Sequence, residues 1–204
     1  GSGNQAVNFS GEKHTGRLQR TINLTVTTNG GAKKALVVNQ AAAAEVVRSD
    51  SPNASVQKTG GNVTITGKSN STKLTFAVTP AEENGLTLQL PANYTAAGKT
   101  TANGAVIADD PGAASEFVWS ITISNVPANV TIEELTATLK VTAAGGQTAN
   151  VTVTQAAGDS TIELDKETIN LDVNGTQQTV NVTSNDSWIW AQVAARTALR
   201  MMGR

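Results

Sequence analysis

Hydrophobic and polar residues alternate with a period of two in many short segments of the chain. In residues 23–28, Leu24 and Val26 lie on one face of the predicted strand and the residues between them lie on the other. The same alternation recurs in residues 62–66, 73–78, 86–90, 120–124, 138–142, 150–154 and 179–183. Alternation over about five residues predicts half-buried strands. Turn pairs such as Asn174-Gly175 separate the segments, so the pattern predicts an antiparallel β-sandwich architecture.

The chain contains an internal repeat. Residues 24–42 align without a gap with residues 139–157, at a constant offset of 115 positions. The matched residues are Leu24 with Leu139, Val26 with Val141, Gly30-Gly31 with Gly145-Gly146, and Gln40 with Gln155. With the offset reduced by one position, the match extends upstream to two further pairs, Val7 with Ile121 and Phe9 with Ile123. Each copy is predicted to be a pair of strands that ends in Gln-Ala-Ala.

A second similarity divides the chain into domains. Residues 62–76 resemble residues 179–191, because both contain a strand, a Ser-Asn turn and a following apolar strand. Residues 44–157 therefore open with the second pattern and close with the first, which predicts one complete sandwich. Residues 1–43 carry only the closing half of such a domain, and residues 158–204 carry only the opening half.

Half of a sandwich has an unpaired edge and a one-sided apolar face, and two or three strands alone are marginal in water. We therefore expect residues 1–43 and 158–204 to form one domain together, with the first part supplied by a neighbouring chain. Closure within one chain is one alternative, and a chain that is a fragment of a longer tandem protein is the other. The residues expected at the assembly interface are Val7, Phe9, Ile22, Leu24, Val26, Trp188, Ile189, Val193 and Met201.

The outer parts of the chain resemble a known family. The residues that carry the likeness are Ile162, Leu164, Ile169, Leu171, Asn174-Gly175, Val180, Val182, Ser184-Asn185 and Trp188. With them, residues 158–188 resemble the start of a BACON domain, an immunoglobulin-like, carbohydrate-associated module of gut bacteria and their phages. The endings at 37–43 and 151–158 resemble the closing strand of that family. The resemblance implies an all-β chain of tandem immunoglobulin-like antiparallel β-sandwiches and no catalytic residues. It is weak over residues 79–118, which look like an insertion.

Three aromatic residues are candidates for contacts with partners. Trp188 and Trp190 alternate with Ile189 on a predicted strand, so both indole rings share one face. Core packing is the expected role of Trp188, and core or subunit contact is that of Trp190. Tyr94 lies in a polar loop, where an exposed ring could stack on a sugar. Tyr94 and Trp190 are therefore the candidate glycan-stacking residues.

The composition excludes several kinds of chemistry. The chain has 204 residues with no Cys and one His, so thiol nucleophiles, disulfides and multi-histidine metal sites are excluded. Carboxylate pairs such as Asp109-Asp110 and Glu133-Glu134 lack a pocket-forming context, and we expect no enzymatic activity, no cofactor and no metal. The formal net charge of −1 favours neither nucleic acid nor an anionic membrane as a partner. No apolar run approaches the ~20 residues that span a bilayer, so membrane insertion is not expected.

The end of the chain changes character. Residues 191–202 are mostly strong helix formers, and Gly203 follows in the position of a C-terminal cap. Val193, Thr197 and Met201 recur at helical spacing. A helix this short is marginal alone, so we expect a short C-terminal helix that docks on another surface. A plain connection between strands is the alternative.

Together these features predict a non-enzymatic structural or adhesive protein that assembles through a split domain. Its expected place is extracellular, on a virion as capsid decoration or on a bacterial cell surface as a fibre. The expected partners are copies of the same chain, head to tail, or a capsid or cell-surface scaffold. The alternative function is a BACON-type module that binds glycans or mucin.

Overall fold

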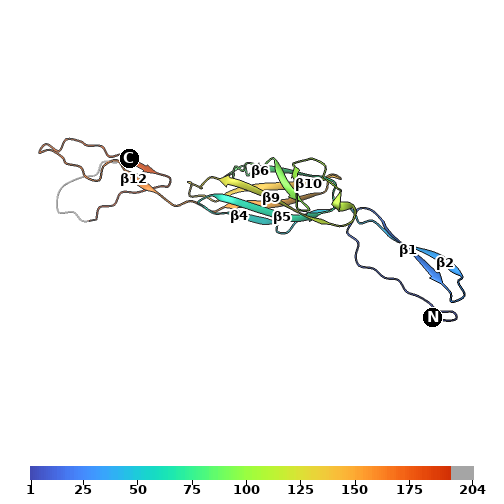
Figure 1. The fold of residues 1–204 in the computed structure, drawn as a ribbon. Coiled ribbons are helices and arrows are strands. Elements are labelled where there is room, and N and C mark those ends of the chain that lie inside the picture. The colour runs from blue at the N-terminus through green and yellow to red at the C-terminus, as the bar shows by residue number, and fades with distance from the viewer. Residues whose placement is uncertain (194–204) are drawn as a thin grey trace.

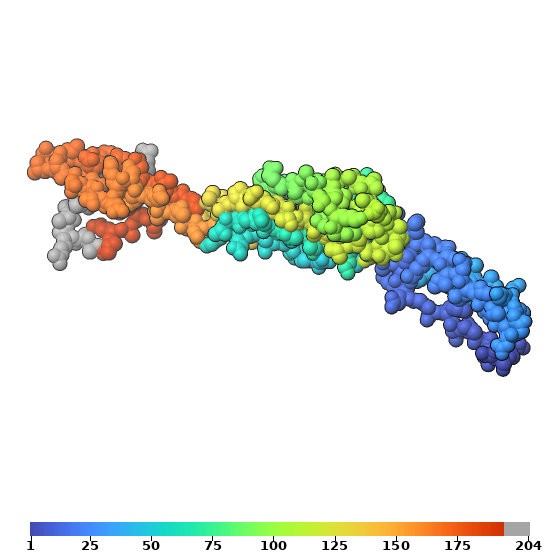
Figure 2. Space-filling model, viewed as in Figure 1, coloured from blue at the N-terminus to red at the C-terminus, as the bar shows by residue number. Residues whose placement is uncertain are grey.

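The computed structural model describes residues 1–193, and residues 194–204 lie outside the described part. The described chain is elongated, with an N-terminal hairpin, a central body and a C-terminal part that follow one another (Figures 1 and 2). The two outer parts lie at opposite ends of the molecule. Within residues 1–193, none of the helical structure is long and apolar enough to cross a membrane.

The described residues are all-β, as the alternating pattern predicted. The strands are β1 (Arg20–Thr27), β2 (Lys33–Gln40), β3 (Val47–Ser49), β4 (Asn53–Val56), β5 (Gly61–Ser69), β6 (Leu74–Pro80), β7 (Asn93–Ala96), β8 (Lys99–Ala102), β9 (Phe117–Val126), β10 (Leu135–Ala143), β11 (Thr148–Gln155), β12 (Ile162–Leu164) and β13 (Val182–Ser184). One turn of 3-10 helix, η1 (Pro111–Ala113), interrupts them. Most neighbouring strands pair antiparallel, and β4 with β11 is a parallel pair.

The central body consists of two sheets that face each other. One sheet has the strand order β4-β11-β10-β6, and the other has the order β3-β5-β9-β7-β8. The strands of this body run from Val47 to Gln155, and they lie within the unit predicted at residues 44–157. The expected insertion at 79–118 contributes η1 and the β7–β8 hairpin, which extends the second sheet beyond β9.

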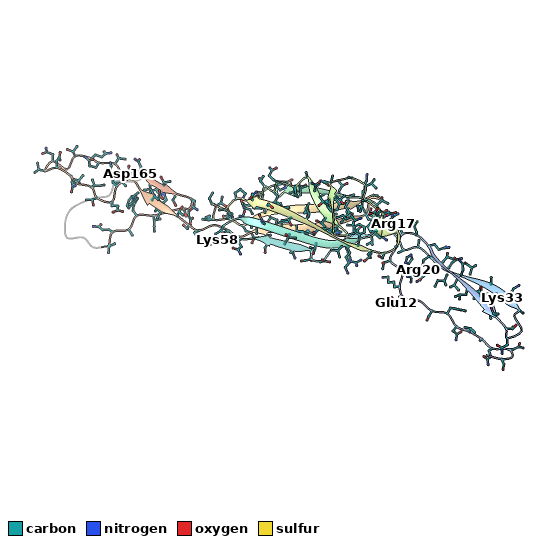
Figure 3. The ribbon with its side chains drawn as sticks, in the orientation of Figure 1. Glu12, Arg17, Arg20, Lys33, Lys58 and Asp165 are labelled. Atoms are coloured by element: carbon teal, nitrogen blue, oxygen red, sulfur yellow. The ribbon has the colours of Figure 1, made fainter. Side chains whose placement is uncertain are left out.

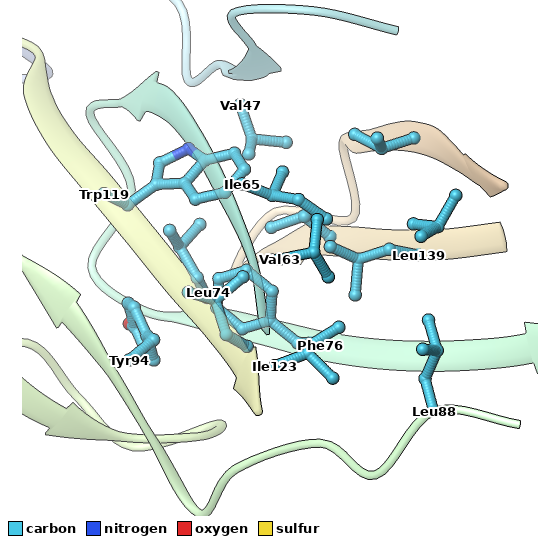
Figure 4. Close-up of a cluster of buried hydrophobic side chains, with 14 of the residues drawn as sticks. Val47, Val63, Ile65, Leu74, Phe76, Leu88, Tyr94, Trp119, Ile123 and Leu139 are labelled. Carbon is cyan, nitrogen blue, oxygen red and sulfur yellow. The ribbon is translucent and has the colours of Figure 1, made fainter. Parts of the chain in front are cut away.

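The core lies between these two sheets (Figure 4). Along β5 and β9, alternate residues are buried, so one face of each strand packs inward and the other faces water. The indole of Trp119 is fully buried, and its ring centre lies 5.5 Å from that of Phe76 in an edge-on arrangement. A side chain at Gly67 would collide with this indole, because a Cβ there would lie 2.3 Å from the ring. The close approach of Trp119 to β5 therefore requires glycine.

One predicted strand is absent. Residues 86–90 alternate in burial, with Leu86 and Leu88 in the core, but they form no sheet ladder. The amide of Leu86 donates to the carbonyl of Thr136 at 2.9 Å, and the segment then runs on without further strand pairing. The sequence pattern therefore predicts the alternating burial of this segment correctly, and its prediction of a strand is wrong.

The N-terminal hairpin repeats the geometry of the β10–β11 hairpin. Arg20 pairs with Gln40 in the first, and Leu135 pairs with Gln155 in the second. Each residue of β1 and β2 thus occupies the position of the residue 115 places later. The repeat seen in the sequence is therefore a repeat of backbone pairing.

The C-terminal part repeats the beginning of the central body with the same offset. Ile162 pairs with Ser184 in the β12–β13 sheet, where Val47 pairs with Ser69 in the β3–β5 pair. The strand predicted at 179–183 is shorter than expected, because only residues 182–184 form a ladder. The offset of 115 therefore relates both outer parts to the central body.

Candidate assembly interface

The apolar face of the N-terminal hairpin is exposed. Val141 of β10 is fully buried, whereas its counterpart Val26 on β1 is 65% exposed. Ala137 is also buried, whereas its counterpart Ile22 is 59% exposed. Within residues 1–193, β1 and β2 form a sheet of two strands that no second sheet covers. Of the other predicted interface residues in this half, Leu24 is half-buried and the following are exposed: Val7 and Phe9.

The C-terminal part presents a second uncovered apolar face. Its β12–β13 sheet also has two strands. The exposed apolar side chains of this part are Ile162, Leu164, Ile169, Leu171, Val173, Trp188, Ile189, Trp190 and Val193. Three of the predicted interface residues, Trp188, Ile189 and Val193, are thus accessible. Met201 and the predicted helix beyond residue 193 lie outside the described residues.

Each outer part lacks the strands that the other one can supply. In the central body, β10 pairs with β6 and β11 pairs with β4. Among residues 1–193, β1 and β2 pair only with each other. The offset of 115 places residues 168–171 at the position of β4 and residues 189–193 at the start of β6. Neither segment forms a strand in the single chain.

A buried glutamine shows how the closing strand is held in the complete domain. Gln155 ends β11 and is almost fully buried. Its Nε2 donates to the carbonyl of Pro127 at 2.8 Å and to the carbonyl of Gln57 at 3.1 Å. These two bonds connect the last strand to both halves of the domain.

The equivalent glutamine in the N-terminal hairpin, Gln40, makes one of these two hydrogen bonds. Gln40 donates from Nε2 to the carbonyl of Glu12 at 2.9 Å, and Glu12 stands 115 places before Pro127. The counterpart of Gln57 is Asp172, which lies in the C-terminal part at the far end of the molecule. Gln40 is half exposed. The repeat makes Gln40 equivalent to Gln155, but the sequence alone does not indicate this hydrogen-bonding role.

An asparagine fixes the junction between the hairpin and the central body. Asn70 donates from Nδ2 to the carbonyls of Thr15 and Ala44, at 3.0 and 2.9 Å, and accepts from the amide of Val46 at 2.8 Å. The side chain is completely buried. It therefore connects the chain before β1 to the chain that enters β3.

A second asparagine makes the same three bonds at the other junction. Asn185 donates from Nδ2 to the carbonyls of Val130 and Asp159, at 3.0 and 2.8 Å, and accepts from the amide of Thr161 at 2.8 Å. Each of these partners lies 115 places after the corresponding partner of Asn70. The two junctions are therefore built alike, and the C-terminal part continues the repeat.

The two outer parts carry opposite charge. Residues 1–43 contain five Lys or Arg and one Glu, a formal charge of +4, and residues 158–193 contain six Asp or Glu and one Lys, a formal charge of −5. Three arginines follow in 194–204, so residues 158–204 as a whole carry −2. Lys33 lies at the tip of the hairpin and Asp165 lies in the C-terminal part, at opposite ends of the molecule (Figure 3). This charge separation favours contact between the two ends of different molecules.

The two candidate glycan-stacking residues, Tyr94 and Trp190, differ in exposure. Tyr94 on β7 is 3% exposed, and its ring centre lies 4.7 Å from that of Phe76. The prediction of an exposed ring at Tyr94 is therefore wrong, because the β7–β8 hairpin folds this residue into the core. Trp188 and Trp190 are 42% and 47% exposed, with ring centres 5.8 Å apart in an edge-on arrangement. Trp190 stays accessible in the single chain.

Several titratable residues of the central body and of its N-terminal junction are engaged in local contacts. Asp109 pairs with Lys99 and Asp110 pairs with Arg17. The hydrogen bond from Lys99 holds the pKa of Asp109 below its ordinary value. His14 is buried and has Nε2 2.6 Å from the carbonyl oxygen of Leu18. Among residues 1–193, no three His, Asp or Glu side chains lie close enough together to hold a metal ion.

A shallow hollow lies on the outer surface of the second sheet. It encloses about 240 Å³ and is lined by Asn93, Tyr94, Thr95, Thr100, Ser120 and Thr122. These lining groups are hydroxyls and an amide, with neither a carboxylate nor an imidazole among them. This hollow therefore offers polar groups, whereas apolar side chains such as Val26 and Ile189 are exposed on the two outer parts.

Comparison with known proteins identifies one family. The family model described as Toastrack DUF4097 matches residues 20–188. This match begins at the first residue of β1 and ends beyond β13, so it spans the hairpin, the central body and most of the described C-terminal part. No curated protein matches the chain significantly.

Proposed function

Because the chain belongs to the Toastrack DUF4097 family, through a match that runs across all three of its parts, we propose that these parts form one continuing β structure. The protein is a non-enzymatic structural or adhesive component whose copies join head to tail. The N-terminal half-domain of one copy completes the C-terminal half-domain of the next. Neighbouring copies are thus joined by a shared domain.

The observation that carries this proposal is the difference in burial between equivalent positions. Val26 has the strand register of Val141 but is exposed, whereas Val141 is fully buried. Covering about 1,000 Å² of such apolar surface would contribute about 25 kcal/mol before the costs of ordering and association. A small remainder of this free energy is enough for stable assembly.

Electrostatics support a second copy as the partner. The hairpin end is basic and the described C-terminal part is acidic. Two identical ends of this chain would repel each other, whereas opposite ends attract. Head-to-tail contact is the arrangement that brings unlike charges together.

The proposal extends to the finer fold and to the location. We interpret each complete unit as an immunoglobulin-like sandwich, on the basis of the two facing sheets of the central body and the BACON-like residues of the C-terminal part. The location follows from the same resemblance, outside the cell on a virion or a bacterial surface. There the chain would act as capsid decoration or as a surface fibre.

Light scattering of the purified 204-residue chain tests the assembly. We expect a mass that grows with concentration, because each copy offers one donor end and one acceptor end. Deleting residues 1–43 should abolish this growth, leave the central body folded by circular dichroism, and leave the Trp188 ring exposed. A deletion variant that forms the same oligomer would contradict the proposal.

A matched pair of point variants separates the interface from general destabilisation. Val26→Asp puts a charge on the apolar face of β1, and Thr25→Asp puts the same charge on the opposite face. The counterpart of Thr25 is Lys140, an exposed charged residue of β10, so Thr25→Asp should be tolerated. We expect Val26→Asp to be monomeric and Thr25→Asp to assemble. Equal assembly of both variants would contradict the role of this face.

Glycan binding is the second candidate function, and the exposure of Trp190 is the observation that favours it. A half-exposed indole can stack on a sugar ring. A glycan array and a mucin pull-down with the Trp190→Ala variant as control would detect it. Binding that Trp190→Ala abolishes, on a chain that stays monomeric, would favour this function over assembly.

A further inference from the structure

Resting on the proposed head-to-tail assembly, we propose that residues 5–10 of one copy form a strand that pairs antiparallel with residues 177–182 of the next copy. In this register, Asn8 lies directly opposite Thr179. The central body serves as the template, because both outer parts repeat its backbone pairing with one offset. The partner is therefore a second copy of this chain.

The template for this pair is the contact between β5 and β9. These two strands pair antiparallel over most of their length in the middle of the second sheet, with Ile65 opposite Ile121 and Thr64 opposite Thr122. The counterpart of β5 is residues 176–184, at the offset of 115. The counterpart of the middle of β9 lies in residues 5–10. Residues 5–10 form no strand in the single chain and are exposed.

The register of this strand follows from which side chains must face inward. With an offset of 114 for residues 5–10, Val7 and Phe9 take the positions of Ile121 and Ile123, which are buried. With an offset of 115, an alanine and the amide of Asn8 would face inward instead. A shift of one residue moves every side chain to the other face of a strand, so the apolar side chains select the offset of 114.

The change of offset from 114 to 115 corresponds to an irregularity in the template. The ladder between β5 and β9 is irregular between Gly61 and Val63, and Asn125 near the end of β9 has a left-handed backbone with φ of 58°. The offset returns to 115 at Glu12, since Gln40 bonds its carbonyl as Gln155 bonds that of Pro127. The hairpin half therefore has one residue fewer at this bulge.

The same template assigns the second hydrogen bond of Gln40. In the central body, Gln155 donates to the carbonyl of Gln57 as well as to that of Pro127. The counterpart of Gln57 is Asp172. Gln40 of one copy therefore donates to the carbonyl of Asp172 in the next copy. This bond fixes the hairpin against the C-terminal part in the same register as the new strand pair.

The pair of Asn8 and Thr179 offers a direct test. In the template, the hydroxyls of Thr64 and Thr122 lie 2.8 Å apart on the exposed face of the sheet. Opposite residues of antiparallel strands have Cα atoms about 4.5–5.5 Å apart, which a disulfide can bridge. Since the chain has no Cys, cysteines introduced at these two exposed positions have no competing thiol.

The experiment mixes a full-length Asn8→Cys chain with a full-length Thr179→Cys chain under mild oxidation. Mass spectrometry of the cleaved products identifies which residues are linked. The matched control replaces Thr179→Cys by Thr183→Cys, which lies on the same face about 14 Å further along the strand. We expect at least tenfold more linkage of position 8 to position 179 than of position 8 to position 183.

The outcomes separate this inference from the proposed function. A chain that assembles by light scattering but links position 8 to 183 as readily as to 179 would overturn the register and leave head-to-tail assembly in place. A chain that stays monomeric at all concentrations would overturn both. A double variant, Asn8→Cys with Thr179→Cys, that closes on itself as a covalent monomer would replace exchange between copies by closure within one chain.

Discussion

The β10–β11 hairpin of the central body and the β1–β2 hairpin at the N-terminus have the same strand register and opposite burial. Leu139 in the first is fully buried, and Leu24 in the second is only half-buried. Both hairpins contain the same alternation and the same Gly-Gly turn. Local sequence therefore determines the hairpin, and the neighbouring sheet determines whether its apolar face leaves water.

The central body and the two outer parts also differ in what they need from a partner. The central body supplies both sheets from residues 44–157, and its strands cover each other. The outer parts supply two strands each, and two strands alone are marginal in water. The protein thus combines a self-sufficient domain with two halves that depend on association.

The largest expected effect comes from removing the same leucine in both hairpins. Leu139→Ala should lower the free energy of unfolding of the central body by about 2–5 kcal/mol, because it opens a cavity in a close-packed core. Leu24→Ala should leave the unfolding of the dilute single chain almost unchanged and weaken its assembly. Urea denaturation at low protein concentration and light scattering at high concentration measure the two effects. Equal destabilisation of the dilute chain by both variants would mean that Leu24 is already packed.

A smaller effect is expected from the two equivalent glutamines. Gln155→Met keeps the side-chain volume and removes two hydrogen bonds, which should cost the central body about 1–3 kcal/mol. Gln40→Met should leave the central body unchanged and raise the dissociation constant of the assembly about tenfold, which corresponds to about 1.4 kcal/mol. Thermal unfolding and sedimentation analysis check the two variants. An assembly that is insensitive to Gln40→Met would argue against its proposed bond to the next copy.

Much of the fold could be predicted from the sequence because its signals are local. Strands such as β5 and β9 have strict alternation, and the complete unit at 44–157 follows from the repeat. The burial of Tyr94 could not be predicted, because it depends on Phe76, which lies in a different sheet. Residues 86–90 show the reverse case, in which alternating burial occurs without strand pairing.

The candidate interface was predictable only in part. The place of apolar residues such as Val26 and Trp188 at the interface was predictable, because both lie in parts of the chain that carry only half of the repeated domain. The roles of Gln40 and Asn185 were not predicted, because their hydrogen bonds reach carbonyls 28 and up to 55 residues away. Both residues nevertheless stand at matching positions of the repeat. Equivalent polar residues at a constant offset are the signal by which such contacts could be found.

The association of the outer parts and the unfolding of the central body should also differ in their dependence on salt. The basic hairpin and the acidic C-terminal part should associate faster at low ionic strength, and raising the salt to 1 M shortens the screening length to about 3 Å. We expect the association rate to fall about tenfold, with little change in the unfolding of the central body. Stopped-flow light scattering measures the rate. In the Lys33→Glu/Lys34→Glu variant the salt dependence should be weaker, and an unchanged dependence would place the attraction elsewhere.

The smallest expected effect concerns Tyr94, whose ring is buried in the core. Burial raises the pKa of Tyr94 above its ordinary value of 10.0. The unfolded chain therefore loses this proton first, so the central body keeps its full stability below pH 10 and loses some as the pH rises beyond it. Since Tyr94 is the single tyrosine, tyrosinate absorbance reports on the central body alone. Tyr94→Phe should remove this alkaline loss and leave assembly unchanged, whereas a tyrosine that ionises at its ordinary pKa would show that the ring is accessible to water.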